Sequence, residues 1–364
     1  MVGWVNSKLR YGLVGGENFT SVPRLPHAAR KMLAPAARGP VHWEGTVRLH
    51  APLIPEMDPL DSASDAPAVA PEAPSSRADV TVRCWGTRGS IPSPGPDTVR
   101  HGGNTTCVEV CGGGMRLIFD AGSGIRPLGM DLVERGPNAI HIFLTHFHWD
   151  HIQGFPFFSP LYDREDAIRV VGPKQKDIDV QNLFAGQMGP IYFPVPFSFV
   201  SATMEFEHLN EGTYELGDFR LDVLRVRHPS FVIGYRISMG ESVICFIPDN
   251  ELDGDMYGEL APGFPSRIID FVGDADLLIH DAMYTGEEYA HRVGWGHSTF
   301  EQALRLGKDG GVKRLLFFHH DPTRTDYELD ALVAKMRESA AVGGHDLEVE
   351  AAMEGVDYRL DIGA

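Results

Sequence analysis

The sequence predicts a mixed α/β (α+β) protein built as a four-layer αββα sandwich. Two successive sets of short apolar runs are separated by turn residues, and helical patterns lie between and after them. Because a sheet must bury its apolar face, two such sets favour a core between two sheets, with helices outside. The predicted strands are 80–85, 106–110, 115–119, 140–144 and 168–171 in the first set, and 214–216, 219–225, 232–238, 243–247, 277–279 and 315–318 in the second; the clearest helical patterns are 298–306 and 327–341.

Residues 1–80 differ from the rest of the chain in composition. They show little periodicity, and the stretch from Met57 to Ser76 is dominated by Ala, Pro, Ser and Asp. Such composition is typical of a disordered or linker-like segment, so we expect one catalytic domain at residues 81–364. Residues 1–56 carry seven Lys or Arg against three Asp or Glu, which indicates either an unusual extension or a true start at Met57.

Charge and cysteine content restrict the partners and the compartment. The formal net charge is −18 and no dense Lys/Arg block is present, which disfavours a long nucleic acid and favours small substrates. The four cysteines are too few for a disulfide scaffold and suit a reducing cytoplasm. The sequence contains no run of about 18 apolar residues, so it predicts no membrane span. We therefore expect a cytoplasmic protein without a membrane partner.

The strongest chemical signal is the segment from Thr145 to His151, directly after the strand predicted at 140–144. Three imidazoles and one carboxylate occupy six consecutive positions. Neutral imidazole and carboxylate are ligands that zinc and similar metals accept. The pattern therefore predicts metal ligation by His146, His148, Asp150 and His151.

This His-x-His-x-Asp-His loop resembles the hallmark of the metallo-β-lactamase superfamily, and the resemblance extends from about residue 82 to about residue 361. It implies that His228 completes a first metal site with His146 and His148. It also implies that Asp249 bridges to a second site containing Asp150 and His151. By the same resemblance, Asp120 orients a ligand histidine from behind.

The last ligand of the second site is expected at the end of the strand 315–318, where His319 and His320 both qualify. In related proteins the ligand is often followed by Asp, and Asp321 follows His320. This comparison favours His320.

Two further segments are similar to the phosphodiesterase and ribonuclease Z-like branch of the superfamily. They are residues 277–282, which contain His280 and Asp281, and residues 296–299, which contain His297. The resemblance implies that His297 donates to a phosphate oxygen or to the leaving alkoxide and that Asp281 orients it. Asp281 stands where the family has Glu, so a looser pair is expected. Asp150, His297 and Asp281 are the expected catalytic residues.

The resemblance implies a hydrolase with two divalent metal ions, zinc first and manganese or iron as alternatives. The paired cations would make hydroxide available at neutral pH. In ribonuclease Z the RNA-gripping arm lies between the third histidine and the bridging aspartate, whereas His228 and Asp249 are only 21 positions apart. We therefore expect a small, cyclic phosphodiester as the substrate. A lactonase or thioesterase, or a non-enzymatic metal-binding sensor, is the alternative.

An aromatic stretch from Gln175 to Phe199 is the last feature that bears on the substrate. It contains Phe184, Tyr192, Phe193, Phe197 and Phe199. Such a run forms either a lid that stacks on a base, part of the core, or the subunit interface of a homodimer.

Overall fold

The fold is described from a computed structural model. The chain divides into two units, Met1–Gly45 and Thr46–Ala364, and all the residues that the structure describes belong to the second. The structure describes residues 47–48, 80–136, 138–254, 263–342 and 346–360. The linker-like segment expected at 1–80 lies almost wholly outside the described residues and stays a prediction.

One sheet contains all five strands predicted in the first set. Within the described residues it has seven strands in the order β15-β2-β3-β4-β5-β6-β7. The pairs β4–β5, β5–β6 and β6–β7 are parallel, and the pairs that β2 and β3 make are antiparallel. The strands are β2 (Val80–Gly86), β3 (Cys107–Gly112), β4 (Met115–Phe119), β5 (Ala139–Phe143), β6 (Ala167–Pro173), β7 (Thr203–Leu209) and β15 (Asp357–Leu360).

The other sheet collects the second set. Its order within the described residues is β1-β8-β9-β10-β11-β12-β13-β14. The pairs from β11 to β14 are parallel, and β8, β9, β10 and β11 form an antiparallel meander. The strands are β1 (Val47–Arg48), β8 (Gly212–Leu216), β9 (Phe219–Val226), β10 (Val232–Met239), β11 (Ser242–Ile247), β12 (Leu277–Asp281), β13 (Arg314–Phe318) and β14 (Glu348–Ala351).

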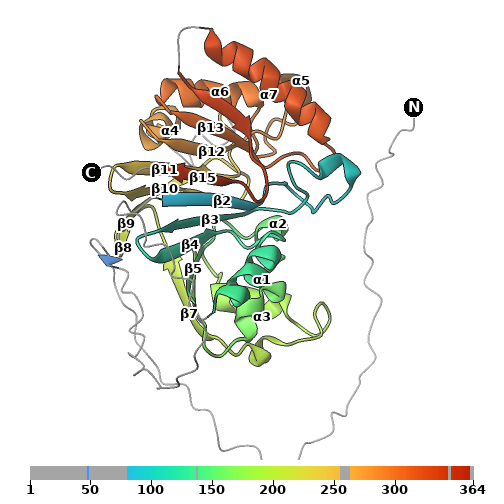
Figure 1. The fold of residues 1–364 in the computed structure, drawn as a ribbon, viewed down its shortest axis with the longest axis vertical. Coiled ribbons are helices and arrows are strands. Elements are labelled where there is room, and N and C mark those ends of the chain that lie inside the picture. The colour runs from blue at the N-terminus through green and yellow to red at the C-terminus, as the bar shows by residue number, and fades with distance from the viewer. Residues whose placement is uncertain (1–46, 49–79, 137, 255–262, 343–345, 361–364) are drawn as a thin grey trace, which may run out of the picture. The chain divides into compact units, whose positions relative to one another are not determined.

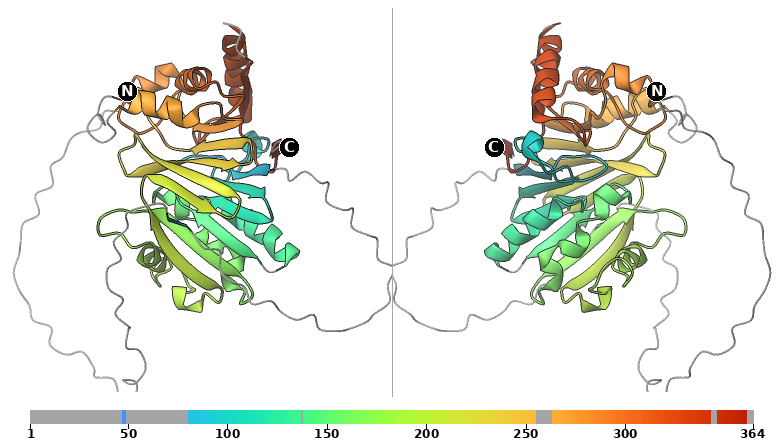
Figure 2. Two further views of the ribbon diagram at one scale, coloured as in Figure 1. Left: turned by 90° about the vertical axis from the view of Figure 1, so that its left-hand side faces the viewer. Right: turned by 90° about the vertical axis from the view of Figure 1, so that its right-hand side faces the viewer.

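Three apolar layers hold the sheets and helices together. Alternate side chains of both sheets face one another, as Phe119 and Phe143 of one sheet do with Tyr235 of the other. The opposite faces pack against helices, those of the second sheet under α4, α6 and α7 and those of the first under α1 and α3 (Figures 1 and 2). The αββα prediction is confirmed. These helices are α1 (Ile125–Arg135), α3 (Val180–Gln187), α4 (Phe264–Val272), α6 (Phe300–Asp309) and α7 (Asp326–Ala341).

Polar residues gather where parallel strands of both sheets end. The carboxyl ends of parallel neighbours lie at one edge of a sheet, so the residues that follow them come together. Asp120 follows β4, and the segment from Thr145 begins just beyond β5. In the other sheet Asp249, Asp281 and His319 lie at the ends of β11, β12 and β13. Among the described residues, no helix is both long and apolar enough to cross a bilayer.

Candidate metal centre

The loop after β5 buries some of its side chains and leaves others exposed. His148 has extended backbone and precedes the short helix α2 (Trp149–Ile152), so Asp150 and His151 lie in the first turn of that helix. His146 and His151 are fully buried, whereas His148 is exposed. The centre therefore meets solvent beside His148.

The first cluster joins the β5 loop to the second sheet. His146, His148, His228 and Asp249 each offer a ligand atom, and these atoms lie within 4.8 Å of one another. Asp249 Oδ2 is 3.6 Å from Nε2 of His146 and 3.6 Å from Nε2 of His228. Three imidazoles and a carboxylate oxygen are a donor set that suits zinc.

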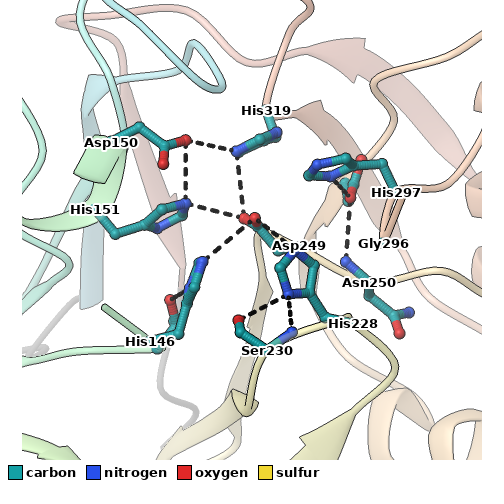
Figure 3. Close-up of polar contacts among 12 residues, drawn as sticks. His146, Asp150, His151, His228, Ser230, Asp249, Asn250, Gly296, His297 and His319 are labelled. Carbon is teal, nitrogen blue, oxygen red and sulfur yellow. Dashed lines mark hydrogen bonds and ion pairs between the residues drawn. The ribbon is translucent and has the colours of Figure 1, made fainter. Parts of the chain in front are cut away.

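The second cluster lies on the other side of Asp249. Ligand atoms of Asp150, His151 and His319 lie within 4.8 Å of one another. Asp249 Oδ1 is 3.1 Å from His151 Nε2 and 3.3 Å from His319 Nε2. The two carboxylate oxygens of Asp249 therefore face different clusters, as a bridging ligand requires (Figure 3).

Several atoms that face the middle of these clusters have no hydrogen bond. They are His146 Nε2, His151 Nε2 and Asp249 Oδ1, all of them buried. Although His151 Nε2 and Asp249 Oδ1 are 3.1 Å apart, they are not aligned as donor and acceptor. A buried polar atom without a partner is costly, typically about 1–3 kcal/mol, and a cation would satisfy all three. These residues therefore fit divalent metal ions.

Protonation in the first cluster also favours metal binding. Burial lowers the pKa of His228 to about 3 and holds the pKa of His146 well below its usual range. Burial alone would raise the pKa of Asp249, but the charges of His319 and His151 keep it well below its usual range. Neutral imidazoles and an ionised carboxylate are the forms that bind metals.

His319, and not His320, joins the centre, so the sequence-based choice of His320 is wrong. Leu316 and Phe318 face the core between the sheets, and regular alternation would turn residue 320 the same way. His319 instead has a φ of 57°, a left-handed conformation that breaks the alternation. His320 Nε2 lies 3.0 Å from the carbonyl oxygen of Ala352, away from both clusters.

Replacing each of these neighbours separately tests the assignment. We expect His319→Ala to lower the metal content by one ion per chain, because it removes a ligand of the second cluster. His320→Ala is expected to keep both ions and to lose about 1–3 kcal/mol of folding stability, because it removes a buried hydrogen-bonding group. Elemental analysis and thermal unfolding of both variants measure this, and loss of metal from His320→Ala alone would reverse the assignment.

Residues behind the ligands hold them in place. Asp120, with a φ of 62°, accepts at Oδ2 from His151 Nδ1 at 2.8 Å and at Oδ1 from the Thr145 backbone N–H at 2.7 Å. This bond makes Nε2 of His151 the nitrogen available to a metal. Ser230 orients the His228 ring, since its Oγ lies 2.9 Å from His228 Nδ1 and its backbone N–H donates to the same nitrogen at 3.2 Å.

Contacts missed from the sequence come from backbone groups. The Ser90 N–H donates to Asp150 Oδ2 at 2.7 Å. A Cβ on Gly89 would lie 2.3 Å from the His319 ring, and one on Gly296 would lie 2.2 Å from His228 Cδ2. Only glycine permits such close approach, and no local sequence motif predicts this contact.

Gly296→Ala is expected to displace His228 and to weaken metal binding by at least about tenfold, the scale seen when groups supporting a ligand are lost. Gly136→Ala is the matched control. Both glycines have a φ of 92°, but a Cβ on Gly136 would meet nothing within 4 Å. Metal titration of the two variants separates ligand displacement from backbone strain, and equal affinities would contradict the steric argument.

His297 and Asp281 form the pair expected from the sequence, and it is not loose. His297 Nδ1 lies 2.8 Å from Asp281 Oδ2, which also accepts from the Asn250 N–H at 3.1 Å. Burial lowers the pKa of His297, but the charge and hydrogen bond of Asp281 outweigh it and raise that pKa to about 9. His297 also lies within 4.8 Å of ligand atoms of Asp249 and His319, so it faces the centre.

The aromatic stretch has no single role. Phe184 is buried and stacks on Phe155 with ring centroids 3.9 Å apart, so it belongs to the core. Phe193 contacts Phe157, whereas Tyr192 and Phe199 are exposed. The core role is therefore confirmed for Phe184 alone, and the lid and the homodimer interface stay predictions.

The sequence of this chain is similar to those of known proteins. A family model described as a beta-lactamase superfamily domain matches residues 115–320. Ribonuclease Z of Haloarcula marismortui is 24% identical over 321 residues, covering 77% of this chain and 96% of the relative. Ribonuclease Z of Pyrococcus furiosus is 27% identical over 296 residues, covering 70% and 91%.

Solved structures with similar folds include two that span the sheets and helices described above. The metallo-beta-lactamase fold protein YhfI from Bacillus subtilis has a TM-score of 0.57 at 18% identity, covering 78% of this chain and 100% of its own. The short form of human tRNase Z has a TM-score of 0.52 at 20% identity, with coverage of 78% and 100%. At these identities the likeness concerns the fold alone.

Proposed function

Since the chain belongs to the beta-lactamase superfamily, we propose that it is a metal-dependent phosphodiester hydrolase. The observation that carries the proposal is Asp249, whose two oxygens face two separate clusters of imidazoles and carboxylates. Two divalent cations bound there would polarise a phosphoryl oxygen and acidify water. Zinc suits the imidazole-rich donor set best, with manganese or iron as alternatives.

The charged residues around the clusters have different roles in the proposed reaction. Asp150 and Asp249 supply ionised oxygens on the two sides of the second cluster. Asp281 holds His297 by Nδ1, which leaves Nε2 to donate a proton to the leaving alkoxide. Burial lowers the pKa of His297, but the charge and hydrogen bond of Asp281 raise it, which favours the protonated form that a proton donor needs. The ligand residues would bind the cations, and His297 would protonate the leaving group.

We propose a small, cyclic phosphodiester as the substrate. The interval between His228 and Asp249, all of which is described, is occupied by the paired strands β10 and β11. No protruding arm for gripping RNA lies in that interval. The net charge of −18 also works against binding many phosphates at once.

RNA is the second candidate, because relatives of this chain carry the name ribonuclease Z. These names are at odds with the sequence-based expectation that disfavours a long nucleic acid. A direct comparison of kcat/KM for a cyclic nucleotide and for a tRNA precursor decides between the two. We expect the cyclic nucleotide to be preferred, and preference for the precursor would overturn the small-substrate proposal.

Turnover of bis-(p-nitrophenyl) phosphate, a lactone and a thioester tests the reaction class. The full chain is stripped with a chelator and reloaded with zinc, manganese or iron. We expect phosphodiester hydrolysis to return with metal. Cleavage of the lactone or thioester alone would favour the lactonase or thioesterase, and no turnover of any substrate would favour a metal-binding sensor.

A further inference from the structure

The main chain on both sides of His297 is hydrogen-bonded to the two residues that follow the bridging aspartate, Asn250 and Glu251. The Ser298 hydroxyl donates to the Asn250 carbonyl oxygen at 2.6 Å. On the other side, the Gly296 N–H donates to Glu251 Oε2 at 2.9 Å. Figure 3 shows Asn250 and Gly296 beside His297. The place of His297 at the centre therefore depends on this short segment.

The stretch directly before His297 contains two glycines with left-handed backbone. Gly294 has a φ of 87° and Gly296 has a φ of 92°. Because glycine has more conformational freedom than any other residue, such a stretch needs bonds from elsewhere to keep one conformation. The backbone N–H groups of both glycines donate to Glu251.

The Glu251 side chain is fully buried and accepts hydrogen bonds at both oxygens. Oε1 accepts from the Tyr289 hydroxyl at 2.7 Å and from the Gly294 N–H at 2.8 Å. Oε2 accepts from the Gly296 N–H at 2.9 Å. A carboxylate can accept at both positions, whereas the amide of a glutamine must turn its NH₂ group toward one of the two glycine N–H donors.

The main chain of Glu251 is bonded to the first cluster. Its N–H donates to the carbonyl oxygen of Arg227 at 2.8 Å, and Arg227 directly precedes the ligand His228. Asp249 lies two residues before Glu251. Glu251 therefore joins the ends of two strands that carry ligands to the loop that carries His297.

We propose that Glu251 is a positioning residue for His297. The proposal rests on the proposed function, in which His297 protonates the leaving group. Asp281 fixes the His297 ring at Nδ1, and Glu251 fixes the main chain that carries this ring. Proton donation needs a short distance to the leaving oxygen, and a displacement of about 1 Å can cost about 10²-fold in rate.

Hydrogen exchange of the backbone amides in the zinc-loaded full chain tests the proposal without requiring turnover. Glu251→Gln should speed exchange at Gly294 and Gly296 at least about fivefold, the scale expected for a lost buried hydrogen bond. Nuclear magnetic resonance measures each amide. Glu251→Asp keeps two acceptor oxygens but is one methylene shorter, so it should give the same effect and serves if the first variant does not fold.

Glu109→Gln is the matched control. Glu109 is also buried, and the partners that the structure describes for it, Trp85, Cys111 and Arg116, lie outside the centre. The control should leave exchange at both glycines and turnover unchanged. Equal acceleration at the glycines in Glu109→Gln and Glu251→Gln would overturn the proposal, because it would reflect general loss of stability.

Kinetics at saturating metal test whether Glu251 acts through His297. Glu251→Gln should lower kcat about 10–10²-fold for an alkyl leaving group, much less for p-nitrophenolate, and change KM by less than about twofold. In a His297→Ala background the same change should lower kcat less than about threefold. Additive losses, or unchanged exchange at the glycines, would overturn the proposal. If the wild type hydrolyses no phosphodiester, the proposed function fails, whereas the exchange result reports on Glu251 alone.

Discussion

Asp249→Asn is expected to lower turnover by more than about a thousandfold and to reduce the metal content from two ions per chain to one or none. The two oxygens of Asp249 face different clusters, and the oxygen toward the second cluster is buried without a hydrogen bond. An asparagine keeps the shape but offers one neutral oxygen and an N–H donor, so it cannot serve both clusters. Elemental analysis of the purified variant measures the loss of metal.

Asp218→Asn is the matched control for this change. Asp218 lies in the exposed turn between β8 and β9, so the same chemical substitution should leave both metals and turnover intact. Two ions per chain in Asp249→Asn would remove Asp249 from the bridge. Loss of metal in the control would point to unfolding rather than to a lost ligand.

His297→Ala is expected to keep both metals and to slow the reaction by about 10²–10⁴-fold, the range typical of a positioned general acid. The effect should depend on the leaving group. A p-nitrophenolate leaves without protonation and should be affected least, whereas an alkyl leaving group should be affected most. Steady-state kinetics on two such phosphodiesters, with metal counted in the same preparation, measures this.

The metal count separates two roles that the geometry of His297 permits. Its ring is stacked on that of His319 at 4.8 Å, close enough for His297 to act as a ligand itself. If His297→Ala loses an ion, ligation explains the lost activity. If the metals remain but both leaving groups suffer equally, proton donation is excluded.

The strand assignments were predictable where apolar residues dominate. The runs now seen as β4, β5 and β11 are buried and were predicted to within one residue at either end. β7 was missed because it alternates weakly apolar residues with Glu205 and Glu207 at an edge of the sheet. α1 was missed because Pro127 and Gly129 interrupt a pattern that tertiary packing nevertheless holds as a helix.

The candidate site was predictable wherever residue type and position after a strand are sufficient. His146, His228 and Asp249 come together as expected, because each follows a buried strand. The choice between His319 and His320 depended on a positive φ at a non-glycine residue, which neighbouring residues do not dictate. The approach of Gly296 to His228 depends on a contact between loops 68 positions apart, which local sequence patterns do not predict.

The measurement that tests the metal centre most directly is anomalous diffraction from crystals of the metal-loaded full chain. We expect two cation peaks on opposite sides of the Asp249 carboxylate, one bound by His146, His148 and His228 and the other by Asp150, His151 and His319. A single peak, or peaks that the Asp249 carboxylate does not join, would contradict the bridged two-metal centre.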